Sequence, residues 1–437
     1  MKTLTKKPKS FMPKPVFKYD TGSRTYWTMD ANGVWICINE SSLKLHLQVH
    51  KFSPIPGKNQ LVSPLEREIV RIQMEENISF AGALAGYQKG IHEVCGNRIL
   101  VTSSHQLIPP APGEFPLLNH ILEGMFYDPI HDQRPYIFGW LKTSIESLRA
   151  STLRPAQVLA IAGPADSFKS SLQNLITLML GGRVAKPYRY MSGSTTFNKD
   201  LFAAEHLMIE DEVALNTIKN RLHFAARIKD FTVNETQSCH GKGREALTLR
   251  PFWRVTISLN DQPEALLILP PIDEGLADKI ILLKAKPFDL PSSTSNLADR
   301  TVFWNALVSE LPAFLLFLQE WKIPPELVSN RFGVTHYHHP DLLRAIDVLA
   351  PEMELLNMID GILFAPGAMR SSEWRGSAAD LQRALVDSSM RHEATRLFHW
   401  SSACGTYLGR LASKMPHRVQ ENRTSEARRW LIHRRSE

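Results

Sequence analysis

The most constraining feature of this sequence is a short apolar run that is followed by a loop and then by a helical pattern. Val158–Ala162 is entirely apolar, which is typical of a strand buried on both faces of a parallel sheet. The loop 163–170 (GPADSFKS) follows directly, and the apolar residues after it recur at helical spacing until Gly181 and Gly182. A buried strand that leads through a short loop into a helix predicts an α/β fold.

This loop has the residues of a phosphate-binding loop, with one exception. In such loops, backbone amides and the helix N-terminus bind phosphate oxygens, a lysine neutralises their charge, and a serine hydroxyl binds Mg²⁺. Lys169 and Ser170 occupy these positions, but Phe168 replaces the usual glycine and either weakens ATP binding or points its ring outward. A chance Lys-Ser pair at a helix start is the alternative. The predicted ATP-binding residues are Gly163, Pro164, Ala165, Asp166, Ser167, Phe168, Lys169, Ser170 and Ser171.

Two later apolar runs end in polar residues that suit ATP hydrolysis. The first ends in Glu210, Asp211 and Glu212, and the second ends in Asn260. Carboxylates at a strand end can organise Mg²⁺ and polarise the attacking water, and an amide can hydrogen-bond the γ-phosphate. We expect Ser170, Glu210 and Asp211 to form the metal site. Glu212 is the alternative acid if the end of the strand is shifted by one residue. An acidic helix cap and an ordinary turn are the alternatives.

The block from Gly163 to Asn260 resembles the motor core of superfamily 3 helicases. The longer stretch 85–290 is similar to primase-helicase-like replication proteins of phages, plasmids and integrated elements. The segments that carry the resemblance are KPYRY (186–190), FNKDLF (197–202), HLMIEDE (206–212), FWR (252–254), SLND (258–261) and LPPIDEGLADK (269–279). The resemblance implies a P-loop NTPase, AAA+-like, that forms a ring, usually a hexamer, and moves along single-stranded DNA by hydrolysing ATP. It also implies that a basic residue of the neighbouring subunit completes each ATP site. Lys279 and Arg254 are the candidates, although lysine lacks the two-pronged geometry of arginine.

Helicases of this kind carry a basic hairpin between the acidic strand and the asparagine-ended strand. The matching stretch here is 238–244 (SCHGKGR), in which two glycines favour a turn. We expect His240, Lys242 and Arg244 to face one way and to contact the DNA backbone. A solvent-exposed loop without a ligand is the alternative.

The C-terminal region has the pattern of three helices and a basic two-stranded wing, and it resembles a winged-helix module. Arg410 and Lys414 fall on the third predicted helix, and Arg423, Arg428 and Arg429 fall on the wing. We expect these residues to contact fork or origin duplex DNA. A winged helix that binds protein is the alternative.

Charge supports contact with a polyanion. The net charge is +7, of which residues 1–20 carry +5 and residues 366–437 carry +6, so residues 21–365 carry −4. Basic ends around a mildly acidic middle are typical of nucleic-acid contact, although solubility alone could also explain them. We find no acidic cluster of a DNA primase, so a primase or polymerase would be a separate partner.

The length of 437 residues predicts several domains. They are a disordered basic arm (1–20), a small α/β accessory domain (21–115), an ATPase domain with leading helices at 116–150 (116–290), a helical connector (291–365) and a winged-helix-like domain (366–437). The four cysteines are far apart and form no CxxC pair, and we recognise no membrane-spanning apolar run. We therefore expect a cytoplasmic protein that makes no membrane contact.

Overall fold

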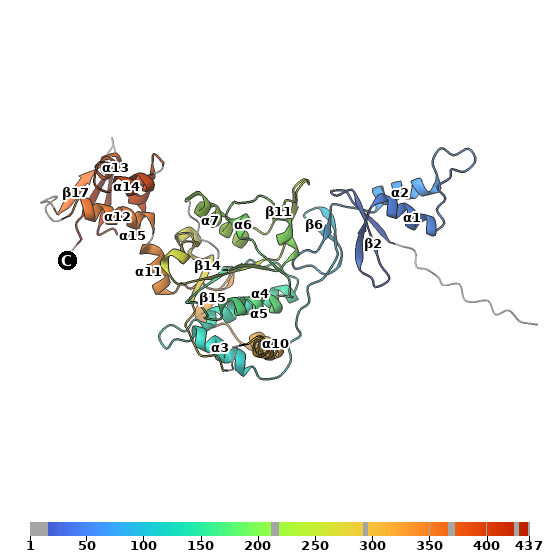
Figure 1. Ribbon diagram of the computed structural model, residues 1–437, viewed down its shortest axis with the longest axis horizontal. Helices are drawn as coiled ribbons and strands as arrows, with labels where there is room; N and C mark the ends of the chain where they lie inside the picture. Colours follow the sequence, from blue (N-terminus) through green and yellow to red (C-terminus); the bar gives the residue numbers. More distant parts are fainter. Residues whose placement is uncertain are drawn as a thin grey trace, which may run out of the picture.

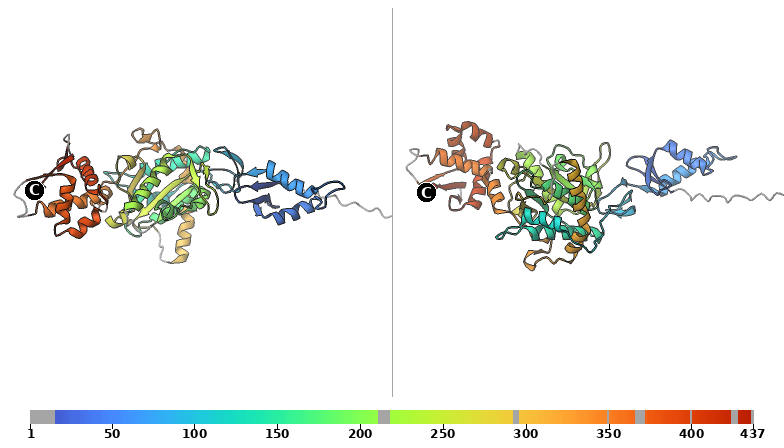
Figure 2. Two further views of the ribbon diagram at one scale, coloured as in Figure 1. Left: turned by 90° about the horizontal axis from the view of Figure 1, so that it is seen from above. Right: turned by 60° about the horizontal axis from the view of Figure 1, so that its bottom comes forward.

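The computed structural model describes residues 16–210, 218–291, 296–348, 350–365, 372–398, 400–423 and 428–435. Three units follow one another along the long axis of the molecule (Figure 1). The N-terminal unit lies at one end, the large central unit in the middle and the C-terminal unit at the other end, and this order is the same in the two views of Figure 2.

The N-terminal unit is a four-stranded sheet covered by two helices. Its elements are β1 (Phe17–Asp20), β2 (Thr25–Met29), β3 (Trp35–Ile38), α1 (Glu40–Val49), α2 (Pro64–Glu75) and β4 (Asn77–Ile78), with strand order β3-β2-β1-β4. The expected hairpin at Asn32-Gly33 forms, because Asp30 accepts backbone hydrogen bonds from the turn and Gly33 has a φ of 74°. Because β1 belongs to the sheet, the expected disordered arm over 1–20 cannot include Phe17–Asp20. Residues 1–15 of that arm lie outside the described part of the structure.

A second small sheet joins this unit to the central one. It contains β5 (Phe80–Gly82), β6 (Gly90–Val94) and β7 (Asn97–Val101) in the order β5-β7-β6. Phe80, Val94 and Ile99 of this sheet pack in the same core as the central strands. The expected accessory domain 21–115 is therefore two sheets, and the second belongs with the central unit.

The central unit is built on a five-stranded parallel sheet. Its strands are β8 (Val158–Ala162), β9 (Val184–Ala185), β10 (His206–Glu210), β13 (Arg254–Leu259) and β14 (Ile280–Lys284), in the order β14-β8-β13-β10-β9. Alternate residues of β8 pack on opposite faces, Val158 and Ala160 in one core and Leu159 and Ile161 in the other. Helices on both faces bury the sheet, as its continuous apolar strands require.

Each face of this sheet has its own set of elements. One face carries α3 (Pro116–Phe126), α4 (Arg134–Arg149), α5 (Lys169–Met179) and α10 (Leu297–Glu320). The other carries α6 (Tyr188–Met191), η1 (Lys199–Ala203), α7 (Ile218–Val233), the hairpin β11 (Gln237–Cys239) and β12 (Leu247–Leu249), α8 (Pro263–Leu266), α9 (Glu274–Ala277) and α11 (Pro340–Val348). Between α10 and α11 the chain forms η2 (Pro325–Leu327), β15 (Val328–Ser329) and β16 (Gly333–Val334).

Helix α10 is long and apolar enough, by length and composition alone, to cross a membrane. We had expected a helix here but no apolar run of membrane-spanning length. Its buried side chains, among them Leu307, Leu311 and Phe314, pack in the same core as α3, α4 and α5. This packing is that of a core helix, and it means that most of the expected connector 291–365 belongs to the central unit.

The C-terminal unit has a separate core of helices and one sheet. Its elements are α12 (Pro351–Ile362), β17 (Glu373–Gly376), α13 (Ala378–Val386), α14 (Arg391–Leu397), α15 (Ala403–Lys414), β18 (Val419–Arg423) and β19 (Arg428–His433), with strand order β17-β19-β18. Leu355 and Ile359 of α12 pack against Leu381 and Leu408. The structure thus begins this unit at Pro351 instead of at residue 366.

Candidate functional site

The candidate site lies along the edge of the central sheet where the parallel strands end. Glu210 closes β10 and is in register with Ser258 of β13, which in turn is in register with Ile161 of β8. Adjacent strands are about 4.8 Å apart, so the backbones of Glu210 and Ile161 are about 10 Å apart. The loop after β8, Asn260 after β13 and Glu210 therefore share one edge, which is where parallel α/β sheets bind ligands.

The loop after β8 turns tightly before α5 begins. Asp166 and Phe168 both adopt left-handed backbone conformations, with φ of 59° and 61°. Gly163 has no room for a side chain, because a Cβ there would lie 2.6 Å from the carbonyl oxygen of Ala285. The loop is thus shaped by close backbone contact at one end and by a left-handed residue at the other.

The Lys169 ammonium folds back into this loop. Its Nζ atom donates hydrogen bonds to the carbonyl oxygens of Gly163 (2.9 Å) and Pro164 (2.6 Å) and to Ser167 Oγ (3.1 Å). The lysine side chain is buried, whereas Ala165 and Ser170 are exposed. The positive charge therefore lies inside the loop, and the Ser170 hydroxyl faces solvent at the first turn of α5.

The Phe168 ring points away from this loop toward the apolar core. Its centroid lies 6.5 Å from that of Phe288 and 6.3 Å from that of Phe303, in edge-to-face arrangements. The ring therefore points out of the loop, and the effect of Phe168 on ATP binding stays a prediction. What remains unusual is the left-handed backbone, which is the conformation that glycine provides without strain.

Glu210 is half-buried and pairs with the ammonium of Lys186, which follows β9. Asp211 and Glu212 lie outside the described residues, so only one of the three expected acids can be placed. Among the residues that the structure describes, no three His, Cys, Asp or Glu side chains gather in a metal-binding group. Asn260 is partly exposed directly after β13, at the position expected of it.

A buried polar network lies beneath this edge and ties α5 to β10 and β13. Both ring nitrogens of His206 form hydrogen bonds. Nδ1 is bonded to Thr177 Oγ1 and Nε2 to Thr256 Oγ1, each at 2.7 Å. Gln173 of α5 donates to Thr256 Oγ1 and to the carbonyl oxygen of Ile209 (2.7 and 3.1 Å). Complete burial lowers the pKa of His206 to about 3, with a smaller contribution from the charge of Lys186. The ring is therefore neutral, and the network fixes the helix after the loop against both polar-ended strands.

Arg254 is not placed for the role that we expected of it. It begins β13, at the opposite edge of the sheet, and only 2% of its surface is exposed. Its guanidinium donates to Ser144 Oγ (2.8 Å) and to the carbonyl oxygens of Trp253 (2.8 Å) and Arg154 (3.0 Å). A side chain that is buried and satisfied within its own subunit cannot reach a nucleotide in another, so Arg254 has a structural role.

Lys279 also lies at that opposite edge, just before β14, and it forms an ion pair with Asp278. The five residues of β14 span about 16 Å. Lys279 is therefore far from the phosphate loop of its own chain.

The expected basic hairpin forms, but its three basic side chains do not face one way. β11 and β12 pair in antiparallel fashion around it. Lys242 is exposed at the tip, whereas Arg244 lies 3.6 Å from the buried carboxylate of Asp20 in the N-terminal unit. The His240 ring packs at 5.1 Å from that of Phe197. Of the three basic residues of the described hairpin, Lys242 is the exposed one, and Arg244 instead joins two units.

The two basic residues of α15 are held by acids of the chain itself. Lys414 pairs with Asp347 of α11 (2.7 Å) and with Glu352 of α12 (3.0 Å), and Arg410 lies 3.5 Å from Glu352. The Glu352 side chain is fully buried. Burial favours the neutral amine of Lys414, but the two carboxylates outweigh it and raise the pKa of Lys414. Both residues are exposed, so these ion pairs compete with the DNA contact that the sequence predicts for them, and that contact stays a prediction.

The wing residues remain at the surface. Arg428 is half-exposed, pairs with Glu421 at 2.6 Å and lies over the ring of Trp430 at 4.7 Å. Arg429 is exposed. Arg423 ends β18, but its side chain is outside the described part of the structure. Arg428 and Arg429 thus keep the accessible positions that the sequence predicts for them.

Comparison with solved structures identifies the fold. An apo form of the NrS-1 C-terminal region superimposes with a TM-score of 0.54 at 11% identity, covering 96% of this chain and 97% of that one. The fold is similar to that of the NrS-1 C-terminal region. A second apo structure of that region gives a TM-score of 0.55, also at 11% identity, with 96% of each chain covered. At this identity the likeness concerns the fold alone. An active helicase, Cch of SCCmec type IV, reaches a TM-score of only 0.32 at 10% identity, with 92% of this chain and 74% of that one covered. No protein-family model and no curated protein matches the sequence.

Proposed function

We propose that this chain is an ATP-dependent DNA helicase of mobile-element replication that forms a ring and moves along single-stranded DNA. The observation that carries the proposal is the strand order of the central sheet. It brings the loop 163–170, Asn260 and Glu210 to one edge, with α5 starting at the lysine of the loop. A triphosphate bound there would meet a cation, backbone amides at a helix start, a carboxylate and an amide.

The residues at this edge fit ATP with Mg²⁺. Gly163 lets the loop begin in close contact with Ala285, and Lys169 already occupies a ring of oxygen acceptors that phosphate oxygens could replace. The exposed Ser170 hydroxyl and the Glu210 carboxylate are oxygen ligands of the kind that Mg²⁺ prefers. Bound Mg²⁺ would neutralise charge on the β- and γ-phosphates.

Each residue then has a distinct task. Lys169 exchanges its loop carbonyls for phosphate oxygens, Ser170 and Glu210 hold the metal, and Asn260 orients the γ-phosphate through its amide. We assign Asp211 and Glu212 to metal binding and water activation. Lys279 would serve the nucleotide of the next subunit, which requires an oligomer, and we propose a hexamer. Lys242 would contact the DNA strand, and Arg428 and Arg429 a duplex at the fork or origin.

A second candidate function has support from Phe168. A left-handed phenylalanine in place of glycine could slow hydrolysis and leave a DNA-binding replication initiator that uses ATP only for assembly. ATP hydrolysis measured with and without single-stranded DNA separates the two functions. The helicase predicts DNA-stimulated turnover that Lys169→Ala abolishes and that the exposed control Lys58→Ala leaves intact. Nucleotide binding without turnover would instead establish the initiator.

A further inference from the structure

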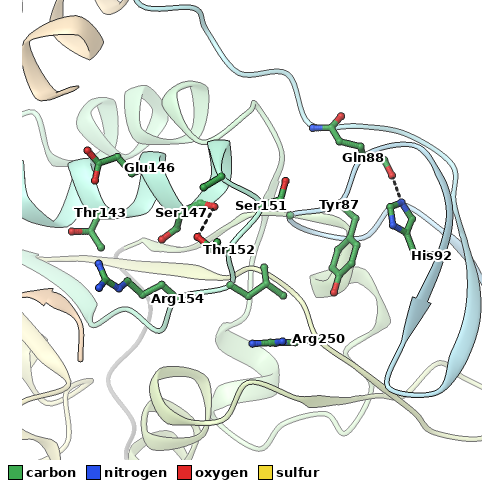
Figure 3. A pocket seen from close by; sticks show the side chains of 13 residues that line it. Tyr87, Gln88, His92, Thr143, Glu146, Ser147, Ser151, Thr152, Arg154 and Arg250 are labelled. Carbon is green, nitrogen blue, oxygen red and sulfur yellow. Dashed lines mark hydrogen bonds between the residues drawn. The ribbon is translucent and has the colours of Figure 1, made fainter. Parts of the chain in front are cut away.

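A polar cavity lies at the opposite edge of the central sheet from the phosphate loop. It has a volume of about 810 Å³, within the ~300–1,000 Å³ range of ligand sites. Its walls come from the β5–β6 connection, β6, the end of α4, the α4–β8 connection and the residue after β12 (Figure 3). Segments distant in sequence therefore converge on it, and none of its residues belongs to the candidate ATP site.

One wall of the cavity is aromatic. The rings of Tyr87 and His92 meet edge to face, with centroids 5.4 Å apart. His92 is fixed by a hydrogen bond between its Nε2 atom and the carbonyl oxygen of Gln88 (2.7 Å), which Figure 3 shows. Gly86, just before Tyr87, is required because a Cβ there would lie 2.6 Å from Phe252 Cβ. The half-buried phenol ring is thus held in a defined place beside the cavity.

The charged groups around the cavity leave a net positive surface. Its one carboxylate, Glu146, is paired with Lys142 at 2.7 Å, and Arg250 is paired with Glu235 at 2.6 Å. Arg154 is exposed in the cavity, and its guanidinium has no ion pair or hydrogen bond within the described chain. Four residues with hydroxyl groups also line the cavity: Thr143, Ser147, Ser151 and Thr152.

A cation, an aromatic face and several hydroxyls in one cavity match the chemistry of a nucleotide. The base can stack on the phenol ring, the phosphate can meet arginine, and hydroxyls can bond the sugar or the base edge. The cavity is open to solvent, as a site for one nucleotide of a longer strand requires. Arg250 also directly follows β12, so the base of the hairpin that carries Lys242 forms part of the wall.

We infer that this cleft binds one nucleotide of a single-stranded DNA, with its base on Tyr87 and its phosphate at Arg154. The inference rests on the proposed function, because a single strand is the substrate proposed there. It adds a second contact point to that strand, at the base of the hairpin instead of at its tip.

Fluorescence anisotropy of a labelled oligothymidylate with the full-length chain tests this inference. Tyr87→Ala should weaken binding about tenfold, as expected for loss of one stacked base, whereas Tyr87→Phe should bind like wild type. Arg154→Ala should weaken binding and reduce the slope of log K against log salt by about 0.7. The exposed control Arg67→Ala, on α2, should change neither quantity. In a bromouracil-substituted strand, ultraviolet crosslinking should label the peptide that contains Tyr87.

Other results would overturn the inference. Wild-type binding by both Tyr87→Ala and Arg154→Ala, with crosslinks elsewhere, would exclude the cleft even if DNA-stimulated ATP hydrolysis supports the helicase. Conversely, a tenfold loss in these variants without any ATP hydrolysis would uphold the cleft and refute the helicase. If a free mononucleotide binds through Tyr87 and the oligonucleotide does not, the cleft is a small-molecule site and the strand assignment is wrong.

Discussion

The left-handed backbone at Phe168 allows a sharp test of the phosphate loop. Its φ of 61° and ψ of 9° place a Cβ in a region that costs an ordinary residue about 1–2 kcal/mol, and glycine pays no such cost. Phe168→Gly and Phe168→Ala lose the same ring contacts with Phe288 and Phe303. The difference between these two variants therefore isolates the backbone. Glycine also gives the unfolded chain more entropy, which offsets part of this gain. The free energy of unfolding of Phe168→Gly should therefore exceed that of Phe168→Ala by about 1 kcal/mol.

Thermal unfolding measures this difference. For a unit of ~150–250 residues, 1 kcal/mol shifts Tm by about 2–4 °C, so Phe168→Gly should melt about 2–4 °C above Phe168→Ala at one scan rate. Wild type should melt above Phe168→Ala, because the partly buried ring contributes a fraction of the about 1.5–3 kcal/mol that complete burial of an aromatic side chain supplies. An alanine variant as stable as the glycine variant would refute the left-handed conformation, and with it the proposed shape of the loop.

Three further predictions concern the network, the C-terminal contact and the start of the loop. Because the pKa of His206 is about 3 in the folded chain and about 6.5 when unfolded, the unfolded state gains a proton first, and stability should fall as the pH drops from 6.5 toward 3. His206→Gln should reduce this dependence, as measured by Tm against pH. Glu352→Gln should remove the ion pair with Lys414 and thereby increase salt-sensitive binding of duplex DNA. Gly163→Ala should lower stability by about 1–3 kcal/mol, since its Cβ meets a backbone oxygen, whereas the helical Gly361→Ala should not.

Each of these predictions has a result that contradicts it. An unchanged slope of Tm against pH in His206→Gln would mean that other groups cause the acid sensitivity. Duplex binding that falls in Glu352→Gln would show that the contact of α12 with α15 supports DNA binding instead of restraining it. Equal stability of Gly163→Ala and Gly361→Ala in chemical denaturation would mean that the loop is not packed against Ala285 as described.

Local patterns in the sequence predict the central elements well. The apolar run of β8, the loop and the helix α5 occur where expected, because each depends on neighbouring residues alone. The N-terminal hairpin around Asn32-Gly33 has the same basis. The shared edge of Glu210 and Asn260 follows from the parallel direction of their strands, once both strands are recognised.

Contacts between distant segments could not be predicted in this way. From the sequence, Arg254 is a candidate functional residue. Only the fold brings Ser144 and the carbonyl oxygen of Arg154 into hydrogen-bonding contact with it. Likewise, nothing near Lys414 in the sequence indicates Glu352, which lies 62 positions earlier but only 3.0 Å away. The boundary of the C-terminal unit also depends on a distant contact. The helix that begins at Pro351 belongs to this unit because it packs in the same core as Leu408, which local composition does not indicate.

The central claim is that the loop at 163–170 and the end of β10 hold one nucleotide between them. A structure of the full-length chain with Mg²⁺ and a non-hydrolysable ATP analogue tests it most directly. The claim predicts phosphates at hydrogen-bonding distance from Lys169 and from the loop amides, with the metal between Ser170 and Glu210. An analogue bound in the cleft beside Tyr87, with the loop still closed on Lys169, would contradict it.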